Sequence, residues 1–409
     1  CGTVADSDYV KSEGKAGRMG QQMMAIVCTR PGRQGKIYLS ADDYPQFWPD
    51  DNAIRARIET LCRRTGLTLP SEPIVTDAKN SCWTYLYGLN TFGDLFTPRQ
   101  MLCLLSFAAA VRETVGELER EGMESERAKA VGTYLGVLVN RLADYNSTGC
   151  VFEVTGEFIA HTFGRQALPM VWDFVELAAF GEASGSPKGA LDWIVGVVEA
   201  QIGFGLPATV SRGSATALPW PDASFDVVIT DPPYYDNVPY ADISDFFYVW
   251  LKRTIGHRYP EHFATEGTPK KQEAVADAVR HGGSKEKART AYEKMMAQAF
   301  VEANRVLKPG GQMTVVYAHK TTLGWATLVD ALRRSGFIVT EAWPLDTERP
   351  GRLREHGSAA LASSIFLVAR KREGMLTGSY EDEVRPDLGR IVRERVDSLW
   401  KMGITGADL

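Results

Sequence analysis

The feature that most limits how this chain can fold is an apolar run that two successive prolines interrupt. The segment SFDVVIT (224–230) has the continuous apolar centre typical of strands buried in parallel sheets. Asp231, Pro232, Pro233 and Tyr234 follow it directly. Because proline has no N–H to give to a sheet ladder, the strand must end there. A carboxylate is thus expected at the carboxyl end of a buried strand, where open α/β sheets bind their ligands.

Strand and helix patterns alternate on both sides of this motif. We expect a helix at about 240–254, a helix ending in RVLKPGG, a strand at 312–319 and a helix closed by Gly336. FIVTEAWPL and ASSIFLVARK are expected to be closing strands, and ATVSRGSA (208–215) a further one. This alternation predicts an α/β protein with a doubly wound, Rossmann-like sheet.

The first half of the chain has a different character. Residues 23–41 predict a β-hairpin, and Thr97 with Pro98 predicts the start of a helix that runs to about Gly122. A second amphipathic helix follows at 124–145, and residues 161–180 favour a core helix beginning near Pro169, with a pocket wall as the alternative. We therefore divide the chain into an irregular region (1–96), a helical insertion (97–200), the sheet domain (201–372) and a helical tail (373–409).

Composition excludes several classes of protein. The net charge of the 409 residues is −5, so a nucleic-acid partner would have to bind a local basic patch. The longest apolar run, at 101–111, is too short to span a bilayer, and we expect a cytoplasmic protein without membrane contact. None of the six cysteines is paired at C-x-x-C spacing, which favours isolated buried or partly buried thiols and no metal site in this chain.

The motif itself suits an exocyclic amine. The Asp231 carboxylate and the Pro232 carbonyl oxygen would each accept one amine hydrogen, while Pro233 shapes the turn. Tyr234 offers a flat face on which a base flipped out of a duplex can stack.

This stretch resembles the DPPY form of the motif that S-adenosylmethionine-dependent amino-methyltransferases use for adenine N6. The wider sequence resembles the zinc-ribbon-containing, adenine-specific DNA methyltransferases. The resemblance rests on YVKSEGKAGRMGQQMMAIV, LFTPRQMLCLLSF, DPPYYDNVPYADISDFFYVWLKR, RVLKPGGQMTVVYAHK and ALASSIFLVARKR. Only the DPPY block is specific by itself.

The resemblance implies a class I methyltransferase sheet and transfer of methyl groups to DNA, with a prokaryotic restriction-modification role. It places Tyr235, Asn237 and Tyr240 at the substrate, with a place in the core as the alternative for Tyr235 and Tyr240, and it places Asp231, Ser214 and Ala215 at the cofactor. Ser214 stands where related enzymes have an acid. The glycine-rich cofactor loop was not found, so we expect the sheet to be incomplete in its N-terminal half. An upstream domain or subunit, with a structural zinc in the full-length protein, would then supply the loop, and the start at Cys1 fits a chain cut within the zinc ribbon.

Basic residues outnumber acids between Lys252 and Lys294, and Lys270 and Lys271 are our candidates for phosphate contact, with an ordinary solvated loop as the alternative. Two other functions stay open: methylation of an amine in RNA, and nucleic-acid binding by a catalytically inactive remnant.

Overall fold

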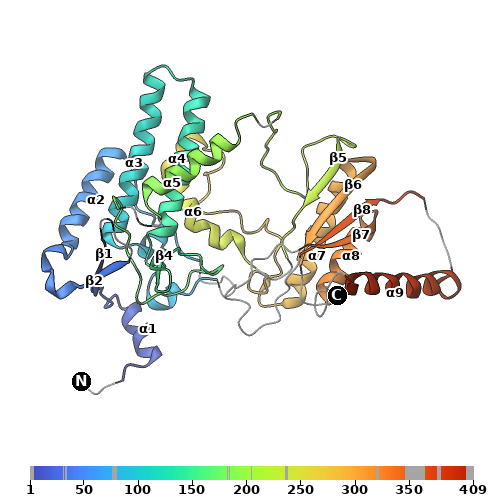
Figure 1. Ribbon diagram of the computed structural model, residues 1–409, viewed down its shortest axis with the longest axis horizontal. Coiled ribbons are helices and arrows are strands. Elements are labelled where there is room, and N and C mark those ends of the chain that lie inside the picture. Colours follow the sequence, from blue (N-terminus) through green and yellow to red (C-terminus); the bar gives the residue numbers. More distant parts are fainter. Residues whose placement is uncertain are drawn as a thin grey trace. The chain divides into compact units, whose positions relative to one another are not determined.

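The computed structural model describes residues 4–30, 32, 35–75, 81–181, 183, 185–203, 205–234, 238–318, 322–345, 364–374 and 379–401. The chain forms two compact units (Figure 1). The helical unit comprises Cys1–Pro207 and Pro239–Glu273, and the sheet unit comprises Ala208–Val238 and Ala274–Leu409.

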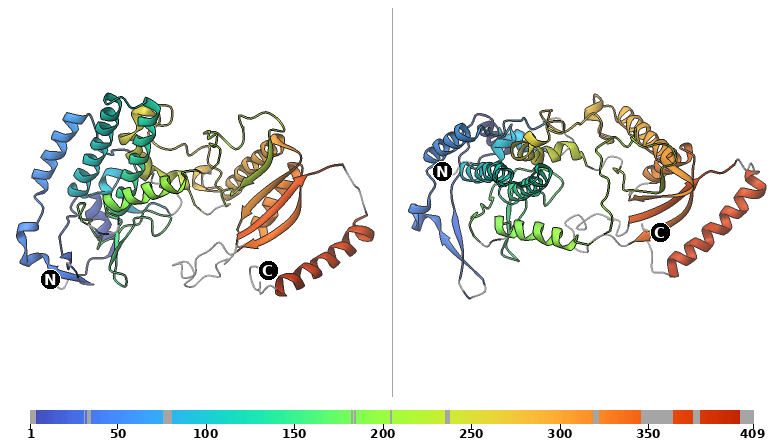
Figure 2. Two further views of the ribbon diagram at one scale, coloured as in Figure 1. Left: turned by 45° about the horizontal axis from the view of Figure 1, so that its top comes forward. Right: turned by 90° about the horizontal axis from the view of Figure 1, so that it is seen from above.

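The helical unit contains six α-helices and two small hairpins among its described residues. The helices are α1 (Ser7–Lys15), α2 (Asp51–Thr65), α3 (Pro98–Arg120), α4 (Ser125–Tyr145), α5 (Pro187–Ala200) and α6 (Tyr240–Thr254). The hairpins are β1 (Ala25–Thr29) with β2 (Lys36–Ser40), visible in Figure 2, and β3 (Val151–Glu153) with β4 (Phe158–Ala160). Short 3₁₀ turns span Ala41–Asp43, Pro45–Phe47, Thr84–Tyr87, Phe92–Leu95 and Gly256–Arg258.

The start of α3 follows the sequence prediction. Thr97 is the N-cap, its side chain accepts from the backbone N–H of Gln100, and the Gln100 side chain reaches back to the Thr97 N–H. This capping box satisfies two of the donors that a helix start leaves unpaired. The first hairpin, the second helix and α6 are confirmed as well.

The core of the helical unit lies where α2, α3, α4 and α6 meet. The rings that follow the DPPY block supply much of it: Phe246 and Trp250 are fully buried, and Phe96 stacks on Phe246 with ring centroids 5.6 Å apart. The sequence places α6 in the domain of the sheet, whereas its side chains pack in the helical unit.

The predicted helix in residues 161–180 is wrong. The segment is irregular, because its backbone groups pair with distant parts of the chain instead of with each other. The Leu168 N–H donates to Ser81 O, and the Val175 N–H donates to Cys150 O. Glu176, from the same segment, forms an ion pair with Arg99 at 2.8 Å.

The sheet unit is built on a four-stranded mixed sheet of order β5-β6-β8-β7. Its strands are β5 (Phe225–Thr230), β6 (Leu307–Tyr317), β7 (Phe337–Leu345) and β8 (Ser364–Lys371). Its helices are α7 (Lys285–Val306), α8 (Thr322–Arg334) and α9 (Arg385–Lys401), with a 3₁₀ turn at Val279–His281 and a π-turn at Tyr380–Val384. β5 and β6 are parallel, while β8 is antiparallel to both of its neighbours. The mixed α/β class is confirmed, and the predicted strand at 208–215 is wrong, since those residues form no strand.

Helices α7 and α8 bury one side of this sheet. Met296 and Phe300 of α7 and Leu332 of α8 pack on Met313 and Val315 of β6 in one core cluster. The expectation that β5 is a fully buried strand is wrong, because Val227 is 51% exposed and Ile229 is 72% exposed. Among the described strands β5 has a single neighbour, and its second face has no described helix packed on it.

Candidate active site

The DPPY block lies at the carboxyl end of β5. Thr230 is the last residue of the strand and pairs with Val315 of the parallel strand β6, so both strands point their carboxyl ends toward the same edge of the sheet. Asp231 is the next residue and is exposed. No described residue forms a hydrogen bond or an ion pair with its carboxylate. The carboxylate oxygens are therefore available to an incoming donor.

The two prolines have different environments. Pro232 is buried and Pro233 is exposed. The hydroxyl of Tyr292, a core residue of α7 that is 2% exposed, donates to the Pro233 carbonyl at 2.7 Å. Within the described part of the chain nothing donates to the Pro232 carbonyl. The turn is thus anchored through Pro233, while Pro232 keeps an acceptor next to Asp231.

Tyr234 is half-buried against the end of the neighbouring strand. Its ring meets that of Tyr317 edge to face, with centroids 5.2 Å apart and planes at 79°, and Tyr317 meets Trp325 of α8 in the same way at 5.2 Å and 84°. Edge-to-face contacts of this kind fix the plane of an aromatic ring. Sequence reasoning missed Tyr292, Tyr317 and Trp325. Only Tyr317 carried a signal, as the last residue of a predicted strand.

The residues expected at the cofactor form a simple surface turn. Ser214 and Ala215 are both exposed. The Ser214 hydroxyl lies 2.8 Å from Thr216 Oγ1 and accepts the Thr216 N–H, so it is used within its own turn. Gly203 and Gly205, with φ of +82° and +53°, lie in a loop after α5 and do not follow a strand. The described residues thus do not assemble a cradle that fits S-adenosylmethionine.

The other predicted site residues divide between the helical unit and the undescribed positions. Tyr240 is the first residue of α6 and is 55% exposed. Lys270 forms an ion pair with the buried carboxylate of Asp245, which also accepts from Thr268 N at 2.7 Å. Lys271 is exposed. Tyr235 and Asn237 lie outside the described residues.

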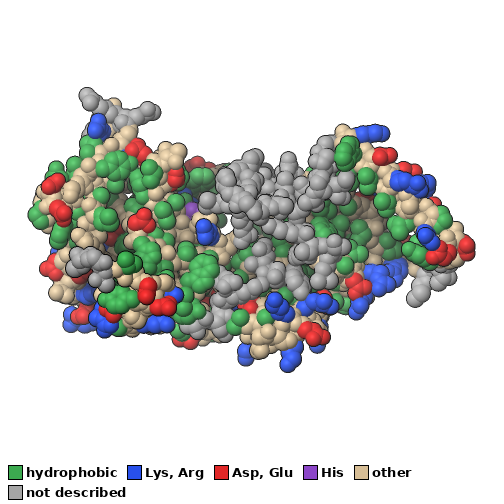
Figure 3. Space-filling view, turned by 90° about the horizontal axis from the view of Figure 1, so that it is seen from below, with side chains coloured by type: hydrophobic (Ala, Val, Ile, Leu, Met, Phe, Trp, Pro, Cys, Tyr) green, Lys and Arg blue, Asp and Glu red, His purple; other side chains and the backbone are tan. Residues whose placement is uncertain are grey.

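Half of the ten lysine and arginine side chains between residues 252 and 294 form ion pairs with acidic partners among the described residues. Beyond Lys270, the described pairs are Arg253–Glu72, Arg258–Glu119, Arg280–Asp277 and Arg289–Glu293. On the one face that Figure 3 shows, acidic and basic side chains occur side by side. The excess of positive charge in this part of the sequence is therefore partly compensated by acidic side chains, and Lys270 as a phosphate ligand stays a prediction.

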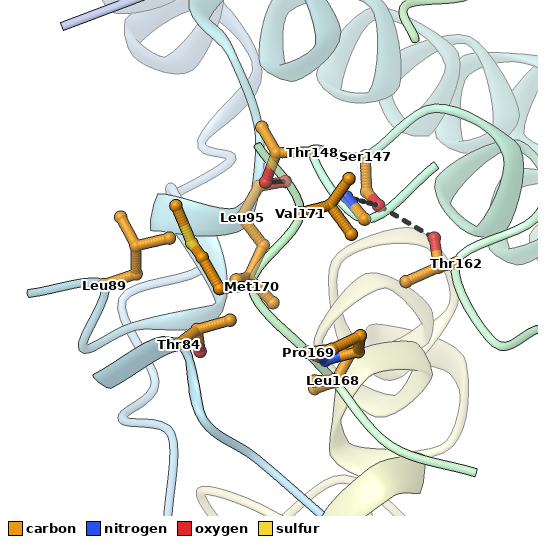
Figure 4. A pocket seen from close by; sticks show the side chains of 11 residues that line it. Thr84, Leu89, Leu95, Ser147, Thr148, Thr162, Leu168, Pro169, Met170 and Val171 are labelled. Carbon is orange, nitrogen blue, oxygen red and sulfur yellow. Dashed lines mark hydrogen bonds between the residues drawn. The ribbon is translucent and has the colours of Figure 1, made fainter. Parts of the chain in front are cut away.

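The helical unit also contains a small cavity, shown in Figure 4. Leu95, Leu168 and Met170 line it together with Ser147 and Thr162, whose hydroxyls lie 2.7 Å apart. Its volume of about 10 Å³ holds no more than about one water molecule. The cavity is too small for a substrate.

No three His, Cys, Asp or Glu side chains of the described residues gather in an arrangement that could hold a metal ion. The five described cysteines are free thiols, two of them buried and three partly buried. No helix in the described ranges has the length and apolar character needed to cross a membrane.

Comparison with known proteins found no matching family model and no matching curated sequence. Among solved structures, matches were found to a protein of Thermus thermophilus that is described as a putative DNA modification methylase. Its selenomethionine form is 17% identical over 41% of this chain and 55% of that one, and a second structure is 18% identical over 41% and 56%. The form complexed with S-adenosyl-L-methionine is 17% identical over 41% and 57%. The TM-score is 0.23 in each case, which is too low to establish a shared fold or function, and the chain spans little more than half the length of these structures.

Proposed function

We propose that this chain carries the amine-binding part of an S-adenosylmethionine-dependent methyltransferase that acts on the N6 amine of adenine in DNA. The observation that carries the proposal is the position of Asp231. An exposed carboxylate without a described partner directly follows a strand paired in parallel, and a second acceptor, Pro232 O, comes next in the chain. Ligands of open α/β sheets bind at this end of the strands.

The chemistry follows from the acceptors. An exocyclic amine has two hydrogens, and two acceptors that take one each fix the nitrogen and the direction of its lone pair. As the nitrogen attacks, positive charge grows on its N–H groups, and the Asp231 carboxylate stabilises that charge. The amine need not lose a proton before it attacks.

The support around the acceptors comes from within the sheet unit. Tyr292 holds Pro233 through its hydroxyl, and Tyr317 holds the ring of Tyr234 edge to face. A ring fixed in this way is a suitable platform for a flipped base. Tyr235, Asn237 and Tyr240 remain proposed substrate contacts, and Lys271 a proposed phosphate contact.

The cofactor would supply an electrophilic methyl group, and this chain's described residues do not assemble its binding site. We propose that another segment or subunit pairs with the open edge of β5 and brings the missing loop. The exposed side chains of Val227 and Ile229 lie on one face of the sheet and favour an addition that also covers this face, because it would remove apolar surface from water. The purified chain alone is then expected to bind S-adenosylmethionine weakly and to lack turnover. Tight binding of this cofactor by the chain alone would contradict that part of the proposal.

The test compares Asp231→Ala with Asp226→Ala. Asp226 lies on the same strand, and its side chain is 78% exposed and paired with Lys308 at 2.7 Å, so it controls for loss of an exposed carboxylate. Both variants would be expressed from the complete gene in bacteria that lack adenine methylation, and N6-methyladenine would be measured in DNA and RNA by nucleoside mass spectrometry. Loss of a group that stabilises transition-state charge lowers the rate on the order of 10²–10³-fold, and we expect this for Asp231→Ala alone.

The other outcomes separate the alternatives. Methylation found only in RNA would identify an RNA enzyme. Equal methylation by Asp231→Ala and the parent protein would refute the role of the DPPY block. DNA binding without methylation, in the parent protein as well as in the variants, would identify a binding remnant.

A further inference from the structure

One arginine of the helical unit has neither a hydrogen-bond nor an ion-pair partner among the described residues, although it is partly buried. Arg112, on α3, is half-buried, and its Nε is shielded from solvent without a hydrogen-bond partner. No described residue forms a hydrogen bond or an ion pair with any atom of its guanidinium group. Buried cationic groups are normally paired, because an unpaired one loses its hydration without compensation.

Arg112 lines a pocket with two further cations. Lys252 and Arg253 of α6 contribute to the same wall, and Gly66, Leu67, Thr68 and Glu72 form the rest. The volume is about 110 Å³, several times the roughly 10–15 Å³ that one water molecule needs. The pocket therefore has room for a polyatomic ion.

The charge in this pocket is only partly compensated by the protein. Three cations face one carboxylate, Glu72, which leaves a formal charge of about +2. Lys252 donates to the Thr265 carbonyl at 2.9 Å and has no acidic partner among the described residues. Burial and then the charge of Arg253 lower the pKa of Arg112, and burial followed by the charge of Arg112 lowers the pKa of His257.

A purely structural role explains Arg253 but not Arg112. Arg253 donates to both carboxylate oxygens of Glu72, at 2.9 and 3.0 Å, and to the Thr68 and Leu69 carbonyls just after α2. These bonds give hydrogen-bond partners to backbone carbonyls that follow the end of α2 at Gly66. Arg112 makes none of these bonds, so no contact among the described residues explains why its charged side chain is half-buried.

We propose that the pocket of Arg112, Lys252 and Arg253 binds a phosphate group. A guanidinium matches the oxygens of a phosphate in a bidentate fork, and a lysine adds a point charge. The side chain of Arg253 is only 6% exposed and is held by Glu72, so it forms a rigid wall for the site. The source of the phosphate is either a nucleic-acid backbone or a small phosphate compound.

This inference does not depend on methyl transfer. The pocket lies within the helical unit, whereas Asp231 lies in the sheet unit. Asp231→Ala is therefore expected to leave phosphate binding unchanged, and failure of one proposal would not imply failure of the other.

The test uses the full chain, with inorganic phosphate and a DNA duplex as separate probes. Arg112→Gln is the main variant and Lys252→Gln the second. Arg120→Gln is the control, because Arg120 lies on the same helix with a side chain that is 72% exposed. Calorimetry would measure phosphate binding, and fluorescence anisotropy would measure duplex affinity at a series of salt concentrations.

We expect Arg112→Gln to weaken phosphate binding about tenfold or more, since hydrogen bonds between charged groups are worth about that factor. If the phosphate belongs to a nucleic acid, the slope of log K against log salt should also become shallower by about one. A loss for inorganic phosphate without a change in slope would identify a small phosphate compound. Unchanged binding of both probes in the Arg112→Gln and Lys252→Gln variants, each folded, would overturn the proposal.

Discussion

The ion pair between Arg253 and Glu72 allows a quantitative test of how the helical unit is held together. Arg253 has a side chain that is 6% exposed and that of Glu72 is 12% exposed. Arg253 also donates to the carbonyls of Thr68 and Leu69, which joins α6 to the segment after α2. A further bond goes to the Val249 carbonyl within α6. Replacing Arg253 by Leu would leave the Glu72 carboxylate buried without its partner.

Breaking a buried pair in this way costs about 3–5 kcal/mol. Thr68 and Leu69 are exposed, so water can satisfy their carbonyls after the substitution. The unpaired Glu72 then dominates the cost, and we expect a loss near the lower end, about 3 kcal/mol. Replacing Glu72 by Gln in the same chain should recover part of this loss, because a neutral amide is less costly to bury than a carboxylate.

Hydrogen exchange of the backbone amides of α3 and α6 is the suitable assay, since a chain with two units need not unfold in one step. Arg18→Leu is the control. Arg18 bonds both oxygens of Glu13 at 2.6 Å, but its side chain is 61% exposed, and surface pairs contribute little. A loss below about 1 kcal/mol for Arg253→Leu, or equal losses for Arg253→Leu and Arg18→Leu, would refute the reasoning.

Two further predictions concern single contacts. Tyr292→Phe removes the hydroxyl that anchors Pro233, and we expect a stability loss of about 0.5–1.5 kcal/mol in hydrogen exchange of the α7 amides together with slower methylation in the assay described above; unchanged methylation would show that the turn needs no anchor. The hydrogen bond that the Asp144 carboxylate accepts from His161 Nδ1 raises the pKa of His161, so its contribution to stability should be complete below the unfolded pKa of about 6.5 and disappear as pH rises through the higher folded value. Asp144→Asn should lower the His161 pKa in an NMR titration, and an unshifted titration would contradict this.

Local signals in the sequence predicted the elements whose boundaries depend on local chemistry. Thr97 and Pro98 mark the start of α3 because a cap and an N-terminal proline act within one turn. Asp231 could be placed at the end of a strand for a similar reason, since prolines 232 and 233 terminate the ladder. The Asp231 carboxylate and the Pro232 carbonyl could therefore be predicted as hydrogen-bond acceptors from the sequence.

The sequence predictions failed where the structure depends on contacts between residues that are far apart in the sequence. Apolar residues near Pro169 suggested a helix, but Leu168 instead pairs with Ser81, which lies far away in the sequence. Likewise, the apolar centre of β5 suggested burial on both faces, although Val227 and Ile229 are exposed. A run of apolar residues indicates that burial is favourable there. Whether the run is buried depends on which elements pack against it.

The open edge of β5 and the rigid turn that follows it have a joint consequence for the proposed enzyme. The contacts that hold Pro233 and Tyr234 come from α7 and β6 and lie within the sheet unit. The acceptor side is thus formed without the cofactor loop that we propose to come from elsewhere. Covering Val227 and Ile229 with an added segment would contribute less than the about 1.5–3 kcal/mol of a full side-chain burial for each, because the two residues are 51% and 72% exposed and not fully exposed. Substrate amine binding and methyl transfer should then be separable, with the first a property of this chain and the second a property of the assembly.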